Sequence, residues 1–277
     1  MKIFITGSNG FIGSHLVKKA LDEGHEVVGL RLPNHTEKIN LPKQPIWISG
    51  TLEDDFSKVL TGCDVVIHLA AYGVNPIYDS WQECFRWNVT ASLNLWDQAH
   101  NAGIKKIIIA GSCSEYGKSA ERYESIPSDA PLEPVNAYGA SKAAATLAAM
   151  AFAREKNMEL AVLRLFHIYG DGESANRFWP GLRKAALEGA DFPMTLGGQI
   201  RDFMPVEQVA EKFLNYATMM SLEPGNPSIQ NVGTGKPQSL LDFAEMYWTK
   251  FGGKGKILPG NIPYRKNEIM RYVPKIE

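Results

Sequence analysis

Cysteine is scarce in this 277-residue sequence, which contains only Cys63, Cys84 and Cys113. Their number is odd and no two have C-x-x-C spacing, so we expect free thiols in a reducing compartment rather than a disulfide framework. The six histidines form no recognisable ligand spacing with them, and no metal site is predicted.

Excess charge and long apolar runs are also absent. Lys and Arg total 29 against 30 Asp and Glu, and they are scattered, which gives no basic patch for nucleic acid or an anionic membrane surface. No apolar run approaches the roughly 20 residues needed to cross a bilayer, and a strand pattern at 2–6 leaves no room for a secretory signal. We therefore expect a cytoplasmic protein that binds neither nucleic acid nor membranes.

Short apolar runs alternate with helical patterns over the first part of the chain. Helical patterns cover 11–23, 81–102 and 137–156, and the apolar runs are KIFIT (2–6), EVVGL (26–30), PIWIS (45–49), DVVIHLA (64–70), KKIIIA (105–110) and LAVLRLF (160–166). Runs such as VVIHL lack polar alternation, as expected of strands buried on both faces of a parallel sheet. Repeated strand–helix–strand units predict an α/β fold with a doubly wound parallel sheet.

Beyond residue 167 Gly and Pro become frequent and the alternation weakens, although helical patterns remain at 178–187, 206–220 and 240–251. We expect a main domain over 1–167 and, over 168–277, mainly a smaller lobe from which some strands return to the sheet.

The first predicted strand leads into TGSNGFIGSH, in which Gly7, Gly10 and Gly13 have G-x-x-G-x-x-G spacing before a helix. Glycines let the backbone turn sharply and approach a pyrophosphate, which the amides of a helix N-terminus then bind. The spacing differs from the G-x-G-x-x-G fingerprint and could mark a flexible turn alone. Its place between the first strand and first helix of a βαβ series favours dinucleotide binding.

The end of the second predicted strand bears on the choice of cofactor. NAD-binding proteins usually carry an acid there for the ribose hydroxyls, whereas an arginine accommodates the 2′-phosphate of NADP. Arg31 follows the strand directly, and the nearest acids, Glu23 and Glu26, lie before it or early in it. Although Arg31 could be an ordinary solvated side chain, we predict NADP, with NAD as the alternative.

Tyr138 and Lys142 lie four residues apart in YGASK, on one face of a predicted helix. A tyrosine has an ordinary pKa near ~10, and a nearby cation is expected to lower the pKa of Tyr138 toward neutrality. Such a pair can exchange a proton with a hydroxyl or carbonyl during hydride transfer. An ordinary helix pair has the same spacing, but the glycine loop and the fifth strand upstream favour the catalytic interpretation.

Together, TGSNGFIG, SCSEYG (112–117) and YGASK resemble the extended short-chain dehydrogenase/reductase superfamily in its nucleotide-sugar branch. Further segments agree over nearly the whole chain: DVVIHLAA (64–71), NVTASLNLWDQA (88–99), LRLFHIYG (163–170), RDFMPVEQVA (201–210) and NVGTG (231–235). The resemblance implies an enzyme with an NAD(P)-binding Rossmann domain, a C-terminal lobe that binds a nucleotide-diphosphate sugar, and a homodimer formed through the helices at 81–102 and 137–156.

In that family the residue four before the tyrosine of the Y-G pair hydrogen-bonds the reacting oxygen, which implies this role for Ser112. Tyr138 would be the acid/base, and Lys142 would bind the nicotinamide ribose and tune the tyrosine. The other cofactor-binding residues implied are Gly7, Gly10, Phe11, Ile12 and Gly13 at the pyrophosphate, Leu69, Ala70 and Ala71 after the fourth strand, and Asn88, which could instead be only a helix cap.

The same resemblance implies the substrate contacts. Arg201 would lie near the nucleotide diphosphate, and Arg177 and Arg265 are further candidates that could equally be surface residues. His167 replaces the family's usual asparagine and is either a substrate contact or structural. Thr51 stands where the family has an acidic residue, which leaves the adenine contact open.

Three reactions use this apparatus: 4-epimerisation, 4,6-dehydration and reduction of a keto-sugar. Dehydratases carry acidic residues just after the Ser or Thr, where this chain has Cys113 and Ser114. Glu115 falls one place later and, on an extended chain, faces the other side, although a bulge could restore it.

A reductase is favoured by Arg31, by the short C-terminal segment, and by the likeness of SCSEYG and PYRKNEIMRYV to CDP-abequose and CDP-paratose synthases. We therefore predict NADPH-dependent reduction of a nucleotide-linked 4-keto-6-deoxysugar. The alternatives are a 4-epimerase with retained NAD, a 4,6-dehydratase, and a non-catalytic cofactor-sensing regulator, which the presence of Ser112, Tyr138 and Lys142 disfavours.

Overall fold

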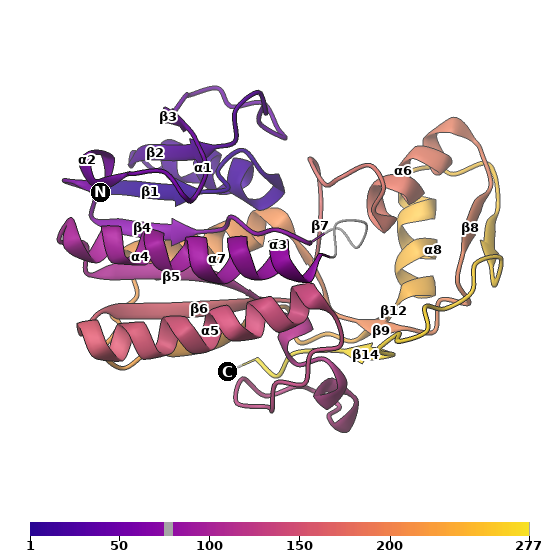
Figure 1. Cartoon of the computed structure of the whole chain (residues 1–277). Coiled ribbons are helices and arrows are strands. Elements are labelled where there is room, and N and C mark those ends of the chain that lie inside the picture. The colour runs from indigo at the N-terminus through magenta and orange to yellow at the C-terminus, as the bar shows by residue number, and fades with distance from the viewer. Residues whose placement is uncertain (75–79, 277) are drawn as a thin grey trace.

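Seven parallel strands form the central sheet of the protein, for which a computed structural model describes residues 1–74 and 80–276 (Figure 1). The strand order is β11-β6-β5-β4-β1-β2-β3. Six strands coincide closely with the predicted runs, and β11 is the seventh. Their bounds are Lys2–Thr6 (β1), Glu26–Arg31 (β2), Ile46–Ser49 (β3), Val65–His68 (β4), Lys106–Ser112 (β5), Glu159–Leu165 (β6) and Ser228–Val232 (β11).

Helices cover both faces of this sheet. On one face lie α1 (Phe11–Asp22) and α7 (Val206–Thr218), and on the other α2 (Ser57–Leu60), α4 (Ser92–Asn101) and α5 (Ala137–Lys156). Because successive strand residues point to opposite faces, Ile3 and Ile5 join the core beside α1 and α7, while Phe4 joins the core beside α4 and α5. Burial on both faces is the reason that the strands are uniformly apolar.

The helical stretch predicted over 81–102 is interrupted. It consists of α3 (Trp81–Phe85), a π-helical turn η2 (Arg86–Ala91) and α4. The Ser80 side chain caps its start by accepting a hydrogen bond from the Glu83 amide at 3.4 Å. A π-turn adds a residue to one turn without changing the apolar pattern much, so hydrophobic periodicity alone did not predict it.

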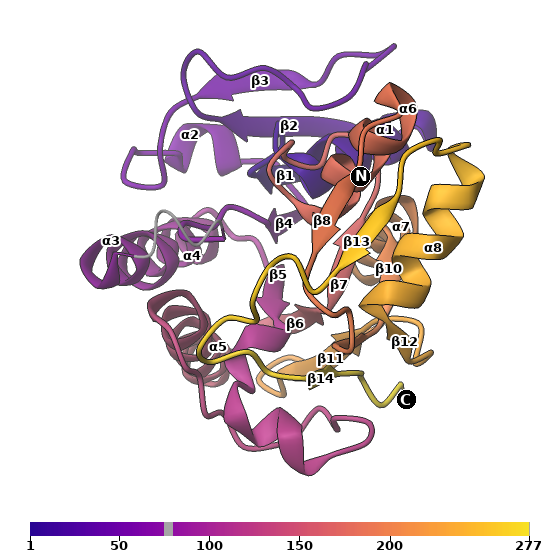
Figure 2. The same ribbon diagram turned by 90° about the vertical axis from the view of Figure 1, so that its right-hand side faces the viewer.

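A smaller cluster of elements lies beyond the carboxyl ends of the sheet strands (Figures 1 and 2). Helices α6 (Phe178–Glu188) and α8 (Leu240–Lys250) pack there around Trp179, Phe243 and Tyr247, next to the paired strands β8 (Phe192–Met194) and β13 (Ile257–Pro259). Short pairings join this lobe to the sheet. They involve β7 (His167–Tyr169) with β10 (Phe203–Pro205), and β9 (Ile200–Arg201) with β12 (Gln238–Ser239) and β14 (Arg271–Tyr272).

The segment between β5 and α5 leaves the sheet through two 3₁₀ turns, η3 (Cys113–Glu115) and η4 (Lys118–Arg122). It packs in a third apolar cluster with Phe166 and Tyr272. Both α7 and β11 lie after residue 167, yet they pack on the sheet or belong to it. The division at residue 167 therefore stays a prediction, with these two elements assigned to the first domain.

None of the helices among the described residues is both long enough and apolar enough to cross a membrane.

Candidate functional site

The glycine loop between β1 and α1 is closely packed. Gly7 has a φ of +63°, and a Cβ atom on it would lie 2.9 Å from the Ala70 nitrogen. A Cβ on Gly13 would lie 2.0 Å from the Gly7 carbonyl oxygen. Only glycine fits at these two positions, because any side chain would collide with backbone.

The N-terminus of α1 has the properties of a phosphate site. Gly10 precedes the helix, and among the described residues no side chain caps it and its first turn carries no acid. The amide groups of that turn are therefore available to an anion at the positive end of the helix dipole. The residues present fit the pyrophosphate of a dinucleotide, as predicted for Gly7, Gly10, Phe11, Ile12 and Gly13.

A buried polar chain fixes the loop that follows β4. The Ala70 amide donates to Thr6 Oγ1 at 3.1 Å, and Thr6 Oγ1 lies 2.8 Å from His68 Nδ1. His68 Nε2 lies 2.9 Å from the hydroxyl of Ser92, which itself donates to the Trp87 carbonyl. Since that hydroxyl proton is used, Nε2 carries the histidine proton and Nδ1 accepts from Thr6. Sequence reasoning missed this role of His68.

His68 is neutral. Its burial lowers its pKa to about 3, and the nearby Lys142 charge acts in the same direction. A neutral imidazole can accept and donate as this chain of bonds requires.

Asn88 holds the same loop from the other side. Its Oδ1 accepts from the Tyr72 amide at 2.7 Å, and its Nδ2 donates to the Tyr72 carbonyl and to Ser141 Oγ, both at 2.9 Å. It lies in η2, inside the helical stretch, and therefore does not cap the start of that helix. Through Asn88 the loop containing Leu69, Ala70 and Ala71 is tied to α5, next to Tyr138.

The structure brings Ser112, Tyr138 and Lys142 together at the carboxyl end of β5. Asn136 caps α5 by accepting from the Gly139 amide at 2.7 Å, which places Tyr138 and Lys142 on successive turns. Ser112 is the last residue of β5 and its hydroxyl hydrogen-bonds the Tyr138 side chain. Gly139 permits this approach, because a Cβ there would lie 2.6 Å from the Ser114 carbonyl oxygen.

The predicted lowering of the Tyr138 pKa is wrong for this environment. Burial raises the pKa of Tyr138 above its ordinary value, although the Ser112 hydrogen bond and the Arg177 charge lower it in part. Burial also lowers the pKa of Lys142, whose side chain is nearly enclosed. The sequence argument counted the cation and left out the cost of charging a group away from water. Tyr138 is therefore held as a neutral phenol.

Glu115 lies beside this group and is fully buried. Its Oε1 accepts from the Ser112 amide at 2.7 Å, and its Oε2 accepts from Thr146 Oγ1 at 2.9 Å and from Arg164 Nε at 2.8 Å. The carboxylate is thus part of an internal ion pair and does not supply the free acid that elimination would need. Cys113–Glu115 forms the 3₁₀ turn η3 rather than an extended chain, so the direction of the Glu115 side chain is fixed by this turn and not by the alternation assumed from the sequence.

The three cysteines are buried thiols. Burial raises the pKa of Cys113 to about 12, so it is protonated at neutral pH and is no nucleophile. Across residues 1–74 and 80–276, no group of three or more His, Cys, Asp or Glu side chains is arranged to hold a metal ion.

Arg31 lies at the end of β2 with two neighbours that sequence reasoning missed. Its guanidinium carbon is 4.7 Å from the centre of the Trp47 ring, and its Nη1 is 3.4 Å from Glu37 Oε1. Glu37 lies six residues after Arg31 and is an acidic residue close to the end of β2, where the adenosine ribose of the cofactor is expected. In the loop after β3, the Thr51 amide donates to Asp54 Oδ2 at 2.7 Å. An acidic side chain therefore lies next to Thr51, the position where the family has an acidic residue.

The predicted substrate residues differ in how deeply they are buried. Arg201 is buried, and its Nη2 donates to Glu268 Oε1 and to the Ile269 carbonyl, both at 2.7 Å. His167 packs between the rings of Phe203 and Tyr272, with centroids 6.1 and 6.0 Å away.

Burial, aided by two arginine charges, holds the pKa of His167 well below its ordinary value. These charges belong to Arg201 and Arg177, and Arg177 also acts on Tyr138. Arg177 thus acts on both His167 and Tyr138 although its side chain is 41% exposed, Arg201 is buried, and Arg265 is exposed.

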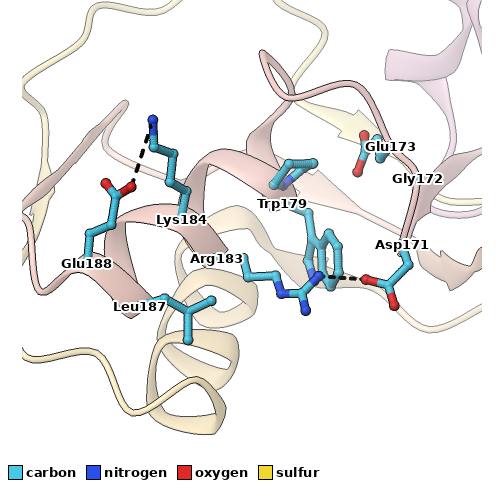
Figure 3. Close-up of a pocket in the computed structure, with 10 residues that line it drawn as sticks. Asp171, Gly172, Glu173, Trp179, Arg183, Lys184, Leu187 and Glu188 are labelled. Atoms are coloured by element: carbon cyan, nitrogen blue, oxygen red, sulfur yellow. Dashed lines mark hydrogen bonds and ion pairs between the residues drawn. The ribbon is translucent and has the colours of Figure 1, made fainter. Parts of the chain in front are cut away.

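A cavity of about 330 Å³ lies between the loop after β7 and helix α6 (Figure 3). Arg183 and Asp171 form an ion pair of 2.6 Å across it. Glu173 lines this cavity, and its Oε1 lies 3.8 Å from Nε of Arg177, one of the predicted substrate residues. The lining residues differ from those predicted for the site and are Gly170, Asp171, Gly172, Glu173, Trp179, Pro180, Arg183, Lys184, Leu187 and Glu188.

The fold and the arrangement of these residues are those of an NAD(P)-dependent enzyme of the short-chain dehydrogenase/reductase type. The chain belongs to the NAD dependent epimerase/dehydratase family, whose family model matches residues 3–233. It is therefore an NAD(P)-dependent enzyme of the nucleotide-sugar branch.

Known proteins of this branch match over almost the whole chain. UDP-N-acetylglucosamine 4-epimerase from Methanobrevibacter ruminantium, in complex with UDP-N-acetylmuramic acid, is 25% identical with a TM-score of 0.89, over 99% of this chain and 89% of that one. MoeE5, in complex with UDP-glucuronic acid and NAD, is 29% identical with a TM-score of 0.85, over 100% and 90%. The dTDP-6-deoxy-L-talose 4-dehydrogenase (NAD(+)) of Aggregatibacter actinomycetemcomitans is 27% identical over 98% of each chain.

Proposed function

We propose that the protein reduces a nucleotide-linked 4-keto-6-deoxysugar, with NADPH as the preferred reductant. The observation that carries this proposal is the state of the Ser112–Tyr138 pair. Tyr138 is kept as a phenol, ready to donate a proton, and the neighbouring Glu115 is engaged by Ser112, Thr146 and Arg164. This arrangement supports proton donation to a developing alkoxide and disfavours elimination.

The proposed chemistry assigns one task to each residue. When bound, the nicotinamide supplies a hydride to a carbonyl carbon or accepts one from a secondary alcohol. Ser112 donates a hydrogen bond to the sugar oxygen, and Tyr138 transfers its hydroxyl proton to that oxygen as negative charge develops on it. Lys142, one turn along α5, binds the nicotinamide ribose and stabilises the phenolate that remains.

The residues around this group would orient the sugar nucleotide. Arg201, Arg177 and His167 lie toward the lobe, where two guanidinium groups suit a diphosphate. Arg201 would have to share or exchange its bond to Glu268 with that diphosphate. Arg265, which is exposed, could reach the same phosphates only from the surface.

The preference for NADPH rests on Arg31, which stacks on Trp47 at the end of β2. A guanidinium held over an indole is positioned to meet a 2′-phosphate. Glu37 favours NAD instead, because its carboxylate can accept hydrogen bonds from a ribose that carries no 2′-phosphate. Isothermal titration should give an NADPH Kd at least about tenfold lower than the NADH Kd, and Arg31→Gln should remove that difference. Equal affinities in the native protein would contradict the preference for NADPH and leave the proposal of a reductase that uses either cofactor.

A 4-epimerase with retained NAD is the second candidate, favoured by the likeness to the Methanobrevibacter enzyme. Epimerisation would use Tyr138 in both directions, first as a base toward a hydroxyl.

The experiment that separates these functions uses the purified protein, NADPH and a panel of CDP-, dTDP-, GDP- and UDP-linked 4-keto-6-deoxysugars. Stoichiometric loss of reduced-cofactor absorbance with at least one of them is the expected result. No consumption with any sugar, together with interconversion of a plain nucleotide-sugar by cofactor that copurifies, would replace the reductase with the epimerase.

A further inference from the structure

Glu115 is a buried charge that the proposed reaction does not use directly. Its carboxylate is inaccessible to solvent and receives three hydrogen bonds, from three different elements. Ser112 ends β5, Thr146 belongs to α5 and Arg164 belongs to β6. A charge so completely enclosed is retained only where its partners compensate the loss of water.

The bonds of Glu115 lead to the catalytic face of α5. Thr146 follows Lys142 by four residues and Tyr138 by eight, which places all three on one side of the helix. The same carboxylate holds the Ser112 amide, while Ser112 Oγ accepts from the Ser114 amide at 3.2 Å in a capping box. Glu115 therefore fixes the backbone that aims the Ser112 hydroxyl, relative to the helix that carries Tyr138 and Lys142.

Its ion-pair partner, Arg164, is itself held by further hydrogen bonds. Arg164 is 4% exposed, and its Nη1 donates to the Tyr116 hydroxyl at 3.0 Å and to the Ser128 carbonyl at 2.8 Å. The guanidinium also lies over the Tyr116 ring, 4.7 Å from its centre. The Glu115–Arg164 pair is thus held in one geometry from both ends.

Several charged or titratable groups face the catalytic pair. Lys142 faces Glu115 and the neutral His68, and Tyr138 faces Cys113, Glu115 and Arg177. Cys113 and His68 are uncharged at neutral pH. Glu115 is therefore the anion that acts on both members of the pair, and it raises the pKa of each.

We propose that Glu115 is a positioning residue of this active site, which anchors Ser112 to the catalytic face of α5 and provides the buried negative charge beside Lys142 and Tyr138. The proposal rests on the proposed function only in assigning the proton transfer to Ser112, Tyr138 and Lys142. Loss of the charge makes both Lys142 and Tyr138 give up their protons at lower pH. Both changes move the alkaline limb of the pH–activity profile to lower pH.

The first test is Glu115→Gln, which keeps the shape and removes the charge. The alkaline limb of kcat should move to lower pH by about 1 unit or more. Thr146→Val removes one hydrogen bond and no charge, and should leave that limb in place. Glu133→Gln is the matched control, since Glu133 pairs with Arg122 on the surface of the same segment and should leave the profile unchanged.

A second readout needs neither cofactor nor substrate. Tyrosinate absorbance of the Tyr138 side chain is obtained as the difference between each protein and its Tyr138→Phe counterpart across pH. The Tyr138 titration should begin at lower pH in Glu115→Gln than in the native protein. This comparison stands even if the panel of keto-sugars gives no turnover, which separates failure of this proposal from failure of the proposed function.

Removing Glu115 leaves Arg164 buried without its partner, which costs about 3–5 kcal/mol and could prevent folding. The double variant Glu115→Gln/Arg164→Met removes both charges with similar volume and should fold while showing the same shifts. A folded variant, single or double, with an unmoved alkaline limb and an unmoved Tyr138 titration would overturn the proposal.

Discussion

Tyr138 is the residue on which the proposed chemistry depends most directly. Its hydroxyl is the group that meets the sugar oxygen, and Ser112 and Lys142 act beside it. Tyr138→Phe should lower kcat by about 10²–10⁴-fold, because the proton donor is lost while the ring still fills its place. Cofactor Kd, measured by quenching of tryptophan fluorescence, should change little. A loss of activity under about tenfold would assign the proton transfer to another group.

Glu173 gives the protein a pH-dependent contribution to stability. Burial raises its pKa from 4.5 to about 7, and the Arg177 charge opposes this only in part. The folded state therefore binds the proton more tightly than the unfolded state. The stabilisation is complete below about pH 4.5 and is lost as the pH rises through about 7.

We expect the free energy of unfolding of the native protein to fall with pH across that window relative to Glu173→Gln, by up to about 3 kcal/mol. Urea denaturation of both proteins at a series of pH values measures this difference. A difference that stays constant with pH would mean that Glu173 is solvated or paired in solution.

At the scale of elements, the π-helical turn η2 determines how the loop after β4 meets α5. Asn88 points from that turn to both backbone groups of Tyr72 and to Ser141. Asn88→Ala would leave these buried groups without partners and should lower the free energy of unfolding by about 2–4 kcal/mol. It should also weaken cofactor binding, because Ala70 lies in the loop that is released.

The control for this prediction is Asn101→Ala, at the exposed end of α4, where the side chain donates to Asp97 on the surface. It should change stability by less than about 0.5 kcal/mol. Urea titrations and cofactor Kd values that are equal for the two variants would show that the Asn88 bonds are dispensable.

Most elements were predictable because their pattern is local. The strands are unbroken apolar runs, and α5 coincides with the predicted 137–156 because Asn136 caps it and its apolar face continues. The predicted positions of Tyr138 and Lys142 at one strand end followed from the same regularity. No local signal predicted η2, because it alters only one turn. The return of strands to the sheet was expected, but which strand returns could not be predicted, because β11 is fixed by its pairing with β6.

Contacts between distant segments account for what the sequence did not predict at the site. Arg164 meets Glu115 across 49 positions, and even Glu37, only six residues after Arg31, meets it through a loop whose path has no local signal. The offset of Glu115 from the dehydratase pattern could be read from the sequence, but the arginine that neutralises it could not. Burial, which raises rather than lowers the pKa of Tyr138, likewise depends on the whole fold.

At the scale of the whole molecule, the outer surface of α3 and α5 suits the homodimer predicted through the two long helices. Trp81, Phe85 and Leu147 are 56%, 37% and 59% exposed, and α3 and α5 lie next to each other on this side of the sheet (Figure 1). Light scattering after gel filtration should give about twice the 30.7 kDa of one chain.

Leu147→Glu should convert that species to a monomer by burying a charge at the interface. Leu187→Glu on α6, which is 66% exposed and lies in the other lobe, should leave the dimer intact. A native protein that elutes as a monomer at micromolar concentration would contradict the predicted homodimer.

The central claim is that the protein transfers a hydride from external NADPH to a sugar carbon while Tyr138 protonates the oxygen. The most direct measurement uses NADPH deuterated at the transferable position of the nicotinamide, the keto-sugar that reacts in the panel, and mass and NMR analysis of the product. One deuterium at carbon 4 of the product sugar, formed by the native protein and formed about 10²–10⁴-fold more slowly by Tyr138→Phe, is the predicted result. Interconversion of a nucleotide sugar without incorporation of deuterium would contradict the claim, because the hydride would then leave and return on cofactor retained by the enzyme, as in an epimerase.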